Sequence, residues 1–264
     1  MSESMSGTEA YYLPVGGGSY QATYATMSPW EPTAQHGGPP SALLAHEMTA
    51  LVEPSMRLGR LAVDFLGPIP RAECLVEARI TKPGRRVCRA EASLSVGGKV
   101  AVAASAWFLA TGPRPPSEGV HDFDVPPLPD EQEQSYFPGL RDWGYGESIE
   151  WRFASGAYDA PGPAQVWCRP LVPLVAGREM TGLERAIVVA DSANGLSNEL
   201  PLGEWLFIPP AMTFTSFRAP SGPWVYMEAV TTLADDGLGL SNGLIGDADG
   251  MCGVVNQPLL IAPT

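Results

Sequence analysis

Apolar residues recur along the chain at two different spacings, and the change from one to the other marks its elements. Between residues 41 and 52 the apolar positions repeat every three to four residues, the spacing of a helix: Leu43, Leu44, Met48, Leu51 and Val52. Pro39 or Pro40 suits the first turn of this helix, where a missing N–H needs no partner, and Pro54 ends it.

After this helix the spacing changes to two, which is typical of strands with one buried face. Four such stretches are separated by glycine- and proline-containing turn signals and cover residues 61–66, 75–80, 87–96 and 100–109. The first half of the chain therefore predicts a helix followed by an antiparallel meander.

The second half of the chain repeats this order. A helix is predicted over 181–190 because Leu183, Ile187 and Val188 lie on one stripe. The predicted strands are 150–154, 165–169, 212–217, 224–233, 238–246 and 251–261. Glu77-Ala78 corresponds to Glu228-Ala229 at an offset of 151, and Gly98 corresponds to Gly250 at an offset of 152. A helix and meander that occur twice predict a tandem repeat of one module.

These patterns divide the chain into four parts. Residues 1–18 end in three glycines and are expected to form a flexible arm, followed by a first module over 19–110. Residues 111–144 contain seven prolines in an acidic stretch, which cannot hold a ladder or a helix for long, so they are expected to form a linker on the surface. Residues 145–264 form the second module.

Composition narrows the classes of function. The 264 residues carry a net charge of −13, which argues against a nucleic-acid partner because phosphate backbones need clustered positive charge. The first ten residues lack the basic and apolar regions of a signal peptide, and no apolar run is long enough to span a membrane. The four cysteines are widely spaced, so we expect a cytoplasmic protein with reduced thiols.

A helix wrapped by an antiparallel meander, present twice, resembles the double-hotdog acyl-CoA thioesterases, the acyl-CoA thioesterase II group and its relatives. Three stretches carry the resemblance: HGGPP at 36–40, LAVDFLGPIP at 61–70, and ADSANG at 190–195 together with NQPLLI at 256–261. The resemblance implies an α+β tandem hotdog, in which two long helices pack on a continuous antiparallel β-sheet. It implies an acyl-CoA substrate and no metal or cofactor.

In that family an aspartate, a hydroxyl residue and a glutamine of the second module hold a water beside the thioester carbonyl. Carried over residue by residue, these are Asp191, Thr213 and Gln257. The chain departs from the pattern at the hydroxyl, whose position falls either at Thr213 or nearer Pro209-Pro210-Ala211, which has no side-chain donor.

The residues themselves allow more than one interpretation. Asp191 follows the apolar run 187–190, so burial should raise its pKa toward that of a useful base; alternatively it caps the next segment or bonds Ser192. Gln257 alternates with Val255 and Leu259, which favours an inward side chain. Thr213 also fits a plain strand former.

Two further clusters are candidates for substrate binding. The backbone N–H groups of His36-Gly37-Gly38, at the start of a helix, can bind an anion or a carbonyl oxygen; alternatively the glycines only permit a tight approach and His36 is an ordinary exposed histidine. Arg85 and Arg86, in the densest basic stretch, can meet the phosphates of CoA or simply form a solvated hairpin. The seven tryptophans fit core and rim packing.

The sequence lacks the motifs of several other enzyme classes. GxSxG, GxxxxGK[ST] and HExxH do not occur, and GxGxxG does not follow a predicted strand. We therefore predict an acyl-CoA thioesterase in which Asp191 activates a water. The alternatives are a non-catalytic acyl-CoA or acyl-lipid binding protein on the same scaffold, and a purely structural module. Apolar faces left over on one chain can pair two chains into a homo-oligomer.

Overall fold

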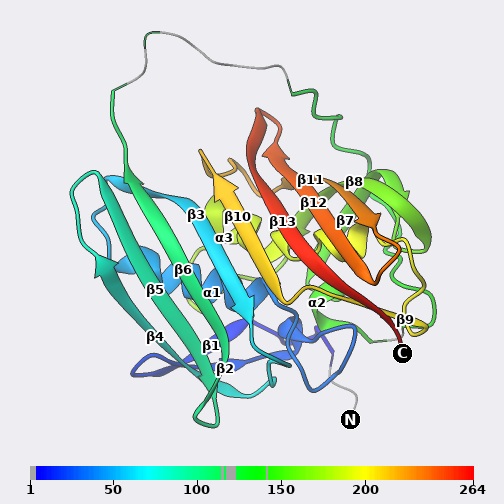
Figure 1. The fold of residues 1–264 in the computed structure, drawn as a ribbon, viewed down its shortest axis with the longest axis horizontal. Coiled ribbons are helices and arrows are strands. Elements are labelled where there is room, and N and C mark those ends of the chain that lie inside the picture. Colours follow the sequence, from blue (N-terminus) through cyan, green and yellow to red (C-terminus); the bar gives the residue numbers. More distant parts are fainter. Residues whose placement is uncertain (1–3, 114–115, 117–122, 141) are drawn as a thin grey trace.

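The computed structural model describes residues 4–113, 116, 123–140 and 142–264. Its described part is built on one antiparallel sheet of 13 strands with its main helices against one face (Figure 1). The neighbour order is β1-β2-β4-β5-β6-β3-β10-β13-β12-β11-β8-β7, and β9 pairs with β13. The first strands and helices are β1 (Tyr12–Gly16), β2 (Ser19–Ala22), the short helix η1 (Tyr24–Thr26), α1 (Gly38–Ala50), β3 (Met56–Phe65), β4 (Glu73–Lys82), β5 (Val87–Val96) and β6 (Lys99–Ala110).

The second half begins with α2 (Gly144–Glu147), β7 (Ile149–Ala157) and β8 (Ala160–Pro170). It continues with α3 (Gly182–Ala190), α4 (Ala193–Leu196), β9 (Trp205–Ile208), β10 (Ala211–Ser216), β11 (Val225–Leu233), β12 (Leu238–Asp247) and β13 (Gly250–Pro263). A helix followed by four strands therefore occurs in both halves, as α1 with β3–β6 and α3 with β10–β13. The four strands are not the simple meander that was predicted, because the first strand of each set pairs with the last, β3 with β6 and β10 with β13.

The two main helices differ in length. α1 has 13 residues, and its first residue, Gly38, is followed directly by Pro39 and Pro40. α3 has nine residues and begins with a capping box, in which Thr181 and Glu184 satisfy each other's backbone N–H groups. α3 matches the predicted helix over 181–190 to within one residue, and it is the shorter of the two because the chain leaves helical bonding at Asp191 and resumes it in α4.

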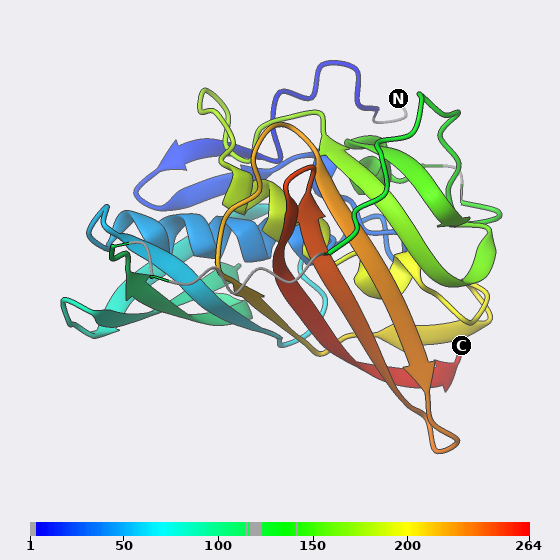
Figure 2. The ribbon, with the colours of Figure 1, turned by 90° about the horizontal axis from the view of Figure 1, so that it is seen from above.

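The sheet is continuous because β3 of the first half pairs with β10 of the second. Figure 2 shows that the sheet curves around the helices, so that its two ends, β1–β2 and β7–β8, lie on the far side of them. The ends are linked there, since Tyr11 and Tyr12 donate backbone hydrogen bonds to Pro173 and Leu174 just after β8. The helices are thus enclosed on most sides.

The expectation of a flexible arm over residues 1–18 is wrong for the last part of this segment. Residues 12–16 form β1, which pairs with β2, and Tyr11 and Tyr12 are fully buried. The three glycines at 16–18 all have positive φ, so they form the tight turn between these strands. The glycine run therefore marks a hairpin.

The expected linker, residues 111–144, includes residues 114–115, 117–122 and 141, which lie outside the described residues. From 123 to 136 it has no regular structure. Gln132 and Gln134 exchange side-chain hydrogen bonds with the backbone of Phe153 and Trp151 on β7, the last strand of the sheet. The linker therefore occupies hydrogen-bonding groups that an open sheet edge would expose.

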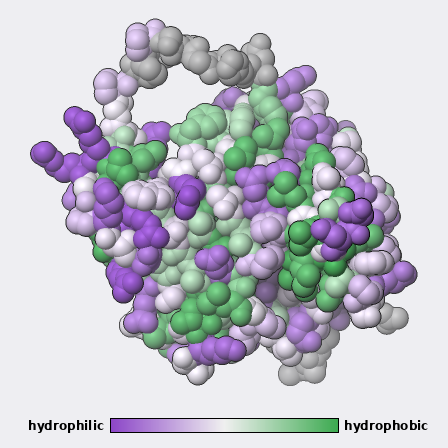
Figure 3. Space-filling model, viewed as in Figure 1, coloured by the Kyte–Doolittle hydropathy of each residue, from purple (hydrophilic) through white to green (hydrophobic). Residues whose placement is uncertain are grey.

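The face of the sheet away from the helices meets solvent. Figure 3 shows that this face mixes hydrophilic and hydrophobic side chains. Exposed apolar residues gather where β9, β13 and β12 pair, with Leu260 opposite both Ile208 and Leu238. Among the described residues there is no helix long and apolar enough to cross a membrane.

Candidate active site

The start of α1 and the end of α3 meet at very short range, and glycine makes this approach possible. A Cβ on Gly38 would lie 2.1 Å from the carbonyl oxygen of Val188 in α3. A Cβ on Gly37 would lie 2.7 Å both from Asp191 Oδ2 and from Cζ of Phe65 on β3. Because the helices run antiparallel here, the first backbone N–H groups of α1 face the carboxylate that follows α3.

Asp191 is the residue at which these elements converge. It caps the C-terminal end of α3 and is 5% exposed. At Oδ1 its carboxylate accepts a hydrogen bond from Gln257 Nε2 at 2.9 Å, and the backbone N–H groups of Gly37 and Gly38 lie beside it and favour its charged form. Burial raises the pKa of Asp191 to about 7, although these three donors oppose the shift. The group can therefore take up and release a proton near neutral pH.

Gln257 faces inward from β13 and is fully buried, as the alternation with Val255 and Leu259 predicted. Its orientation is fixed from both ends. Oε1 accepts the backbone N–H of Asn194 at 3.2 Å, which turns Nε2 toward Asp191. The amide thus holds the carboxylate and cannot take its proton.

His36 lies on the other side of the carboxylate, with Nδ1 3.2 Å from Asp191 Oδ2. Burial lowers the pKa of His36 to about 3, so the ring is neutral at neutral pH and the contact is not an ion pair. Nδ1 accepts the N–H of Gly38 at 3.2 Å and therefore presents a lone pair. The ring stacks on Tyr145 with centroids 3.7 Å apart. His36 therefore points into this site, and the alternative of an ordinary exposed histidine is wrong.

Tyr145 and Ser192 complete the surroundings of His36, and sequence reasoning did not select them. The Tyr145 hydroxyl bonds the Ser192 hydroxyl at 2.7 Å and the carbonyl of Val188 at 2.8 Å. Tyr145 belongs to α2, a four-residue helix right after the expected linker. A helix of four residues is too short to show a helical repeat of apolar positions. The only signal in the sequence here is the aromatic residues next to glycines.

Thr213 does not join this site. Its partner on β13 is Asn256, which is exposed, and directly paired residues point to the same face of a sheet. The neighbours of Thr213 along β10, Met212 and Phe214, are buried on the helix side. The Thr213 hydroxyl therefore lies on the face opposite to Asp191. Pro210, which precedes β10, offers only its carbonyl, bonded to the N–H of Phe65.

The chain matches two family models in succession. Residues 26–109 match the N-terminal domain of acyl-CoA thioesterases, and residues 122–261 match the C-terminal domain. The chain belongs to the acyl-CoA thioesterase family. Membership makes it a thioester hydrolase. The gap between the two matched segments, residues 110–121, overlaps the start of the predicted linker, and the rest of the predicted linker belongs to the C-terminal match.

Solved structures of similar fold agree with this assignment. A conserved protein with a hot dog fold from Alicyclobacillus acidocaldarius is 16% identical over 99% of this chain and 100% of its own, with a TM-score of 0.73. An acyl-CoA thioesterase II from Mycobacterium marinum is 16% identical over 96% and 95%, with a TM-score of 0.66. At this identity the likeness shows the hot dog fold alone. None of the curated proteins compared with the chain matches it.

The thioesterase's basic hairpin lies away from the Asp191 carboxylate. Arg85 and Arg86 are exposed between β4 and β5, at the end of the sheet where β3 begins at Met56. The site lies where β3 ends at Phe65. The two are thus separated by the length of a ten-residue strand, roughly 30 Å. The structure does not bring these arginines together with Asp191, and their contact with CoA stays a prediction.

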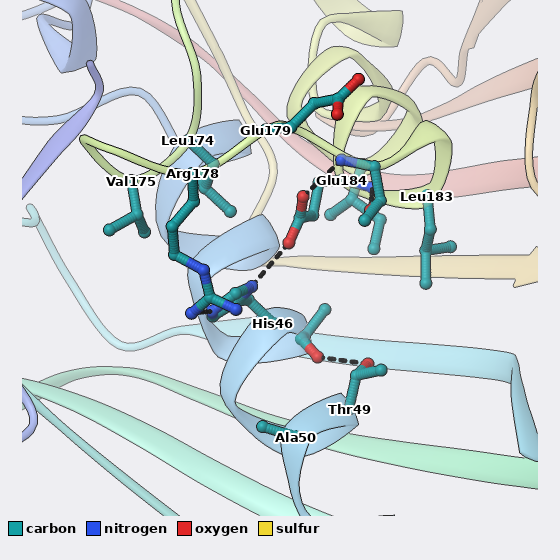
Figure 4. A pocket seen from close by; sticks show the side chains of 12 residues that line it. His46, Thr49, Ala50, Leu174, Val175, Arg178, Glu179, Leu183 and Glu184 are labelled. Atoms are coloured by element: carbon teal, nitrogen blue, oxygen red, sulfur yellow. Dashed lines mark hydrogen bonds and ion pairs between the residues drawn. The ribbon is translucent and has the colours of Figure 1, made fainter. Parts of the chain in front are cut away.

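A second polar cluster occupies the opposite ends of the same two helices (Figure 4). There His46 of α1 contacts Glu184 Oε1 through Nδ1 at 2.6 Å and Arg178 through Nε2 at 2.8 Å. These residues line a pocket of about 220 Å³. Within the described part of the thioesterase, no cluster of three or more histidine, cysteine or acidic residues is arranged to hold a metal ion.

Proposed function

We propose that this thioesterase hydrolyses acyl-CoA by the attack of a water molecule that the Asp191 carboxylate deprotonates. The observation that carries the proposal is the buried carboxylate of Asp191, which has a pKa of about 7 and on which the Gln257 amide and the Gly37-Gly38 backbone converge. A base is most effective when its pKa lies near the working pH. No charged partner neutralises this carboxylate, because His36 is uncharged.

The reaction follows from these groups. The water oxygen bonds to the thioester carbon while one water proton passes to Asp191. The thioester carbon thereby becomes the centre of a tetrahedral intermediate. The intermediate expels sulfur, the carbon–sulfur bond breaks, and the CoA thiolate takes the proton back from Asp191. The products are a free carboxylic acid and CoA, and the residue ends in its starting form.

Each partner of Asp191 has a role in this scheme. Gln257 fixes the carboxylate through Oδ1, leaving the orientation of the other oxygen to the backbone of Gly37 and Gly38. The hydrogen bonds of these donors keep the pKa from rising further with burial. We assign Gly37 and Gly38 to the first hotdog module and Asp191 and Gln257 to the second, so one site would need both modules.

A second function has one observation in its favour. The side-chain hydroxyl that would help to hold a water is missing at Pro209-Pro210, and Thr213 faces the opposite side of the sheet. A protein that binds acyl-CoA without hydrolysing it would have no use for that hydroxyl. This is the alternative against which turnover has to be measured.

The experiment is release of CoA, followed with a chromogenic thiol reagent over a series from acetyl-CoA to palmitoyl-CoA. Turnover that falls about 100-fold or more in Asp191→Asn, while the variant still binds acyl-CoA, supports the proposal. Tight binding of acyl-CoA by the wild type without any thiol release would instead support the binding protein.

A further inference from the structure

A small cavity lies directly beside the Asp191 site. Its volume is about 20 Å³, enough for a single oxygen-sized group and too small for an acyl chain. Its wall includes His36, which contacts Asp191, and Ser192, the next residue in the chain. It also includes Asn194, whose backbone N–H orients Gln257. The cavity is therefore bounded by the immediate neighbours of the proposed base and its amide partner.

Two buried polar groups in this wall lack partners. Trp143 and Tyr158 both line the cavity, and each is 2% exposed. Among the described residues, neither Trp143 Nε1 nor the Tyr158 hydroxyl makes a hydrogen bond of normal distance and angle. Burial raises the pKa of Tyr158 well above its usual value. The hydrogen-bonding group that opposes this shift is the Ser192 hydroxyl, which is itself bonded to the Tyr145 hydroxyl at 2.7 Å. Leaving such groups buried and unpaired is destabilising.

Two other buried aromatic residues, which do not line the cavity, show the usual arrangement. Trp151 packs edge-on against Tyr158, and its Nε1 donates to the carbonyl of Gly146 at 2.9 Å. Tyr11, also fully buried, accepts a hydrogen bond from Ser148 at 2.9 Å. The missing partners are thus confined, among these four residues, to the two that line the cavity beside Asp191.

From this juxtaposition we infer that Trp143 and Tyr158 bind the carbonyl oxygen of the thioester and stabilise the negative charge that develops on it during hydrolysis. The indole N–H can only donate a hydrogen bond. A donor suits an oxygen that gains negative charge, whereas a nucleophilic water needs an acceptor for its proton. The cavity admits one oxygen and no larger group. This inference rests on the proposed hydrolysis and adds the groups that would bind the oxygen in it.

The assignment also gives a role to the stretch between the two modules. Trp143 immediately precedes α2, and Phe137 from the expected linker packs against both Trp143 and Tyr158. Trp30, His36 and Gly195 are the partly exposed members of the wall, so the carbonyl would enter from their side. The linker would then build the oxygen-binding wall while the two modules supply the base.

The test compares two conservative variants with two matched controls. Trp143→Phe and Tyr158→Phe remove one donor each, and Trp151→Phe and Tyr11→Phe make the same changes at buried residues outside the cavity. We expect kcat for acyl-CoA hydrolysis to fall roughly 100-fold in each cavity variant with KM little changed. The controls should lose unfolding stability, because they break existing hydrogen bonds, and keep kcat within about threefold of the wild type.

The outcomes separate this inference from the proposed function. Turnover by the wild type together with cavity variants that match their controls would overturn the oxygen-binding role alone. A loss of kcat that tracks the loss of stability across all four variants would also overturn it. A wild type that releases no CoA from any acyl-CoA would overturn both. Tyr158→Phe removes a single oxygen atom, so it keeps the test decisive if Trp143→Phe does not fold.

Discussion

The two ends of the α1–α3 helix pair each hold a buried carboxylate, and their surroundings push the two groups in opposite directions. At one end, Asp191 is held by backbone N–H groups and an amide, and burial raises its pKa to about 7. At the other end, burial also disfavours the charge of Glu184, but hydrogen bonds from His46 and from the backbone of Thr181 outweigh it and lower its pKa.

The difference shows how one helix can carry a reactive acid and an inert one. The two carboxylate oxygens of Glu184 accept hydrogen bonds, one within the capping box and one from His46, which in turn bonds Arg178. This arrangement is typical of a structural carboxylate. Asp191 has neutral partners and no cation among them, so its proton affinity stays high.

The largest effect should come from neutralising the two acids in turn. Asp191→Asn keeps the shape of the side chain and removes the base, so kcat for acyl-CoA hydrolysis should fall by about 100-fold to 10,000-fold. Glu184→Gln should leave kcat within a few-fold and lower the unfolding temperature. Equal losses of kcat in the two variants would remove the distinction between the two ends.

The pH dependence of stability should have opposite signs at the two ends. The pKa of Asp191 is about 7 in the folded chain and near 3.8 when unfolded, so the folded state binds this proton more tightly. Its contribution is fully present below about pH 4 and is lost as pH rises through 7, a change of about 4 kcal/mol. The free energy of unfolding of Asp191→Asn, measured with urea from pH 4 to 8, should lack this loss.

Glu184 should act in the opposite sense. Its pKa is lowered in the folded chain, so its contribution is present above its unfolded value of 4.5 and is lost as pH falls below that value. Glu184→Gln should therefore be closest to the wild type in stability at the acid end of the same titration. His36, whose pKa is lowered to about 3, adds stability as pH rises over much of the same range, so the comparison is made between the wild type and Asp191→Asn. Stabilities of these two proteins that change in parallel from pH 4 to 8 would contradict the environment assigned to Asp191.

Much of this fold could be predicted from the sequence, because it depends on period and turns. The strands predicted over 87–96 and 100–109 match β5 and β6 almost residue for residue, and Gln257 points inward as its neighbours required. The spacing of apolar residues, however, indicates which face of an element is buried. It does not indicate which buried groups contact each other. The contact of Asp191 with Gly37 and Gly38 depends on the distance between two helices about 150 positions apart.

The parts that were missed have physical reasons as well. Thr213 was selected for its hydroxyl, but its position in the β10–β13 register places it on the outer face. Trp143 fitted core packing because a sequence cannot show that a buried indole N–H lacks a partner. α2 and α4, with four residues each, are too short to show a helical period.

A smaller effect should come from the glycine that lets the two helix ends meet. In Gly38→Ala the new Cβ would lie 2.1 Å from a backbone oxygen, so α1 and α3 must separate. We expect a loss of about 3 kcal/mol in the free energy of unfolding, since overpacking against a backbone is poorly relieved. Gly112→Ala is the control, because no atom lies within 4 Å of its Cβ. Equal stability of the two variants would contradict the close approach.

The smallest effect concerns the structural end alone. His46→Ala leaves Glu184 without its side-chain partner and should cost about 1–2 kcal/mol in the free energy of unfolding. His46→Gln, which can still donate a hydrogen bond to Glu184, should recover part of this loss. kcat should be unchanged in both variants. A drop in kcat without a drop in stability would mean that this end also takes part in turnover.

The most direct test of a water activated by Asp191 is a single turnover in ¹⁸O-labelled water. Enzyme in excess over acyl-CoA is allowed to react once, and the free acid is analysed by mass spectrometry. Attack by water predicts one ¹⁸O atom in the carboxylic acid formed in this first turnover. Acid that carries only ¹⁶O would mean that the Asp191 carboxylate itself attacked the thioester, which would contradict its role as a base.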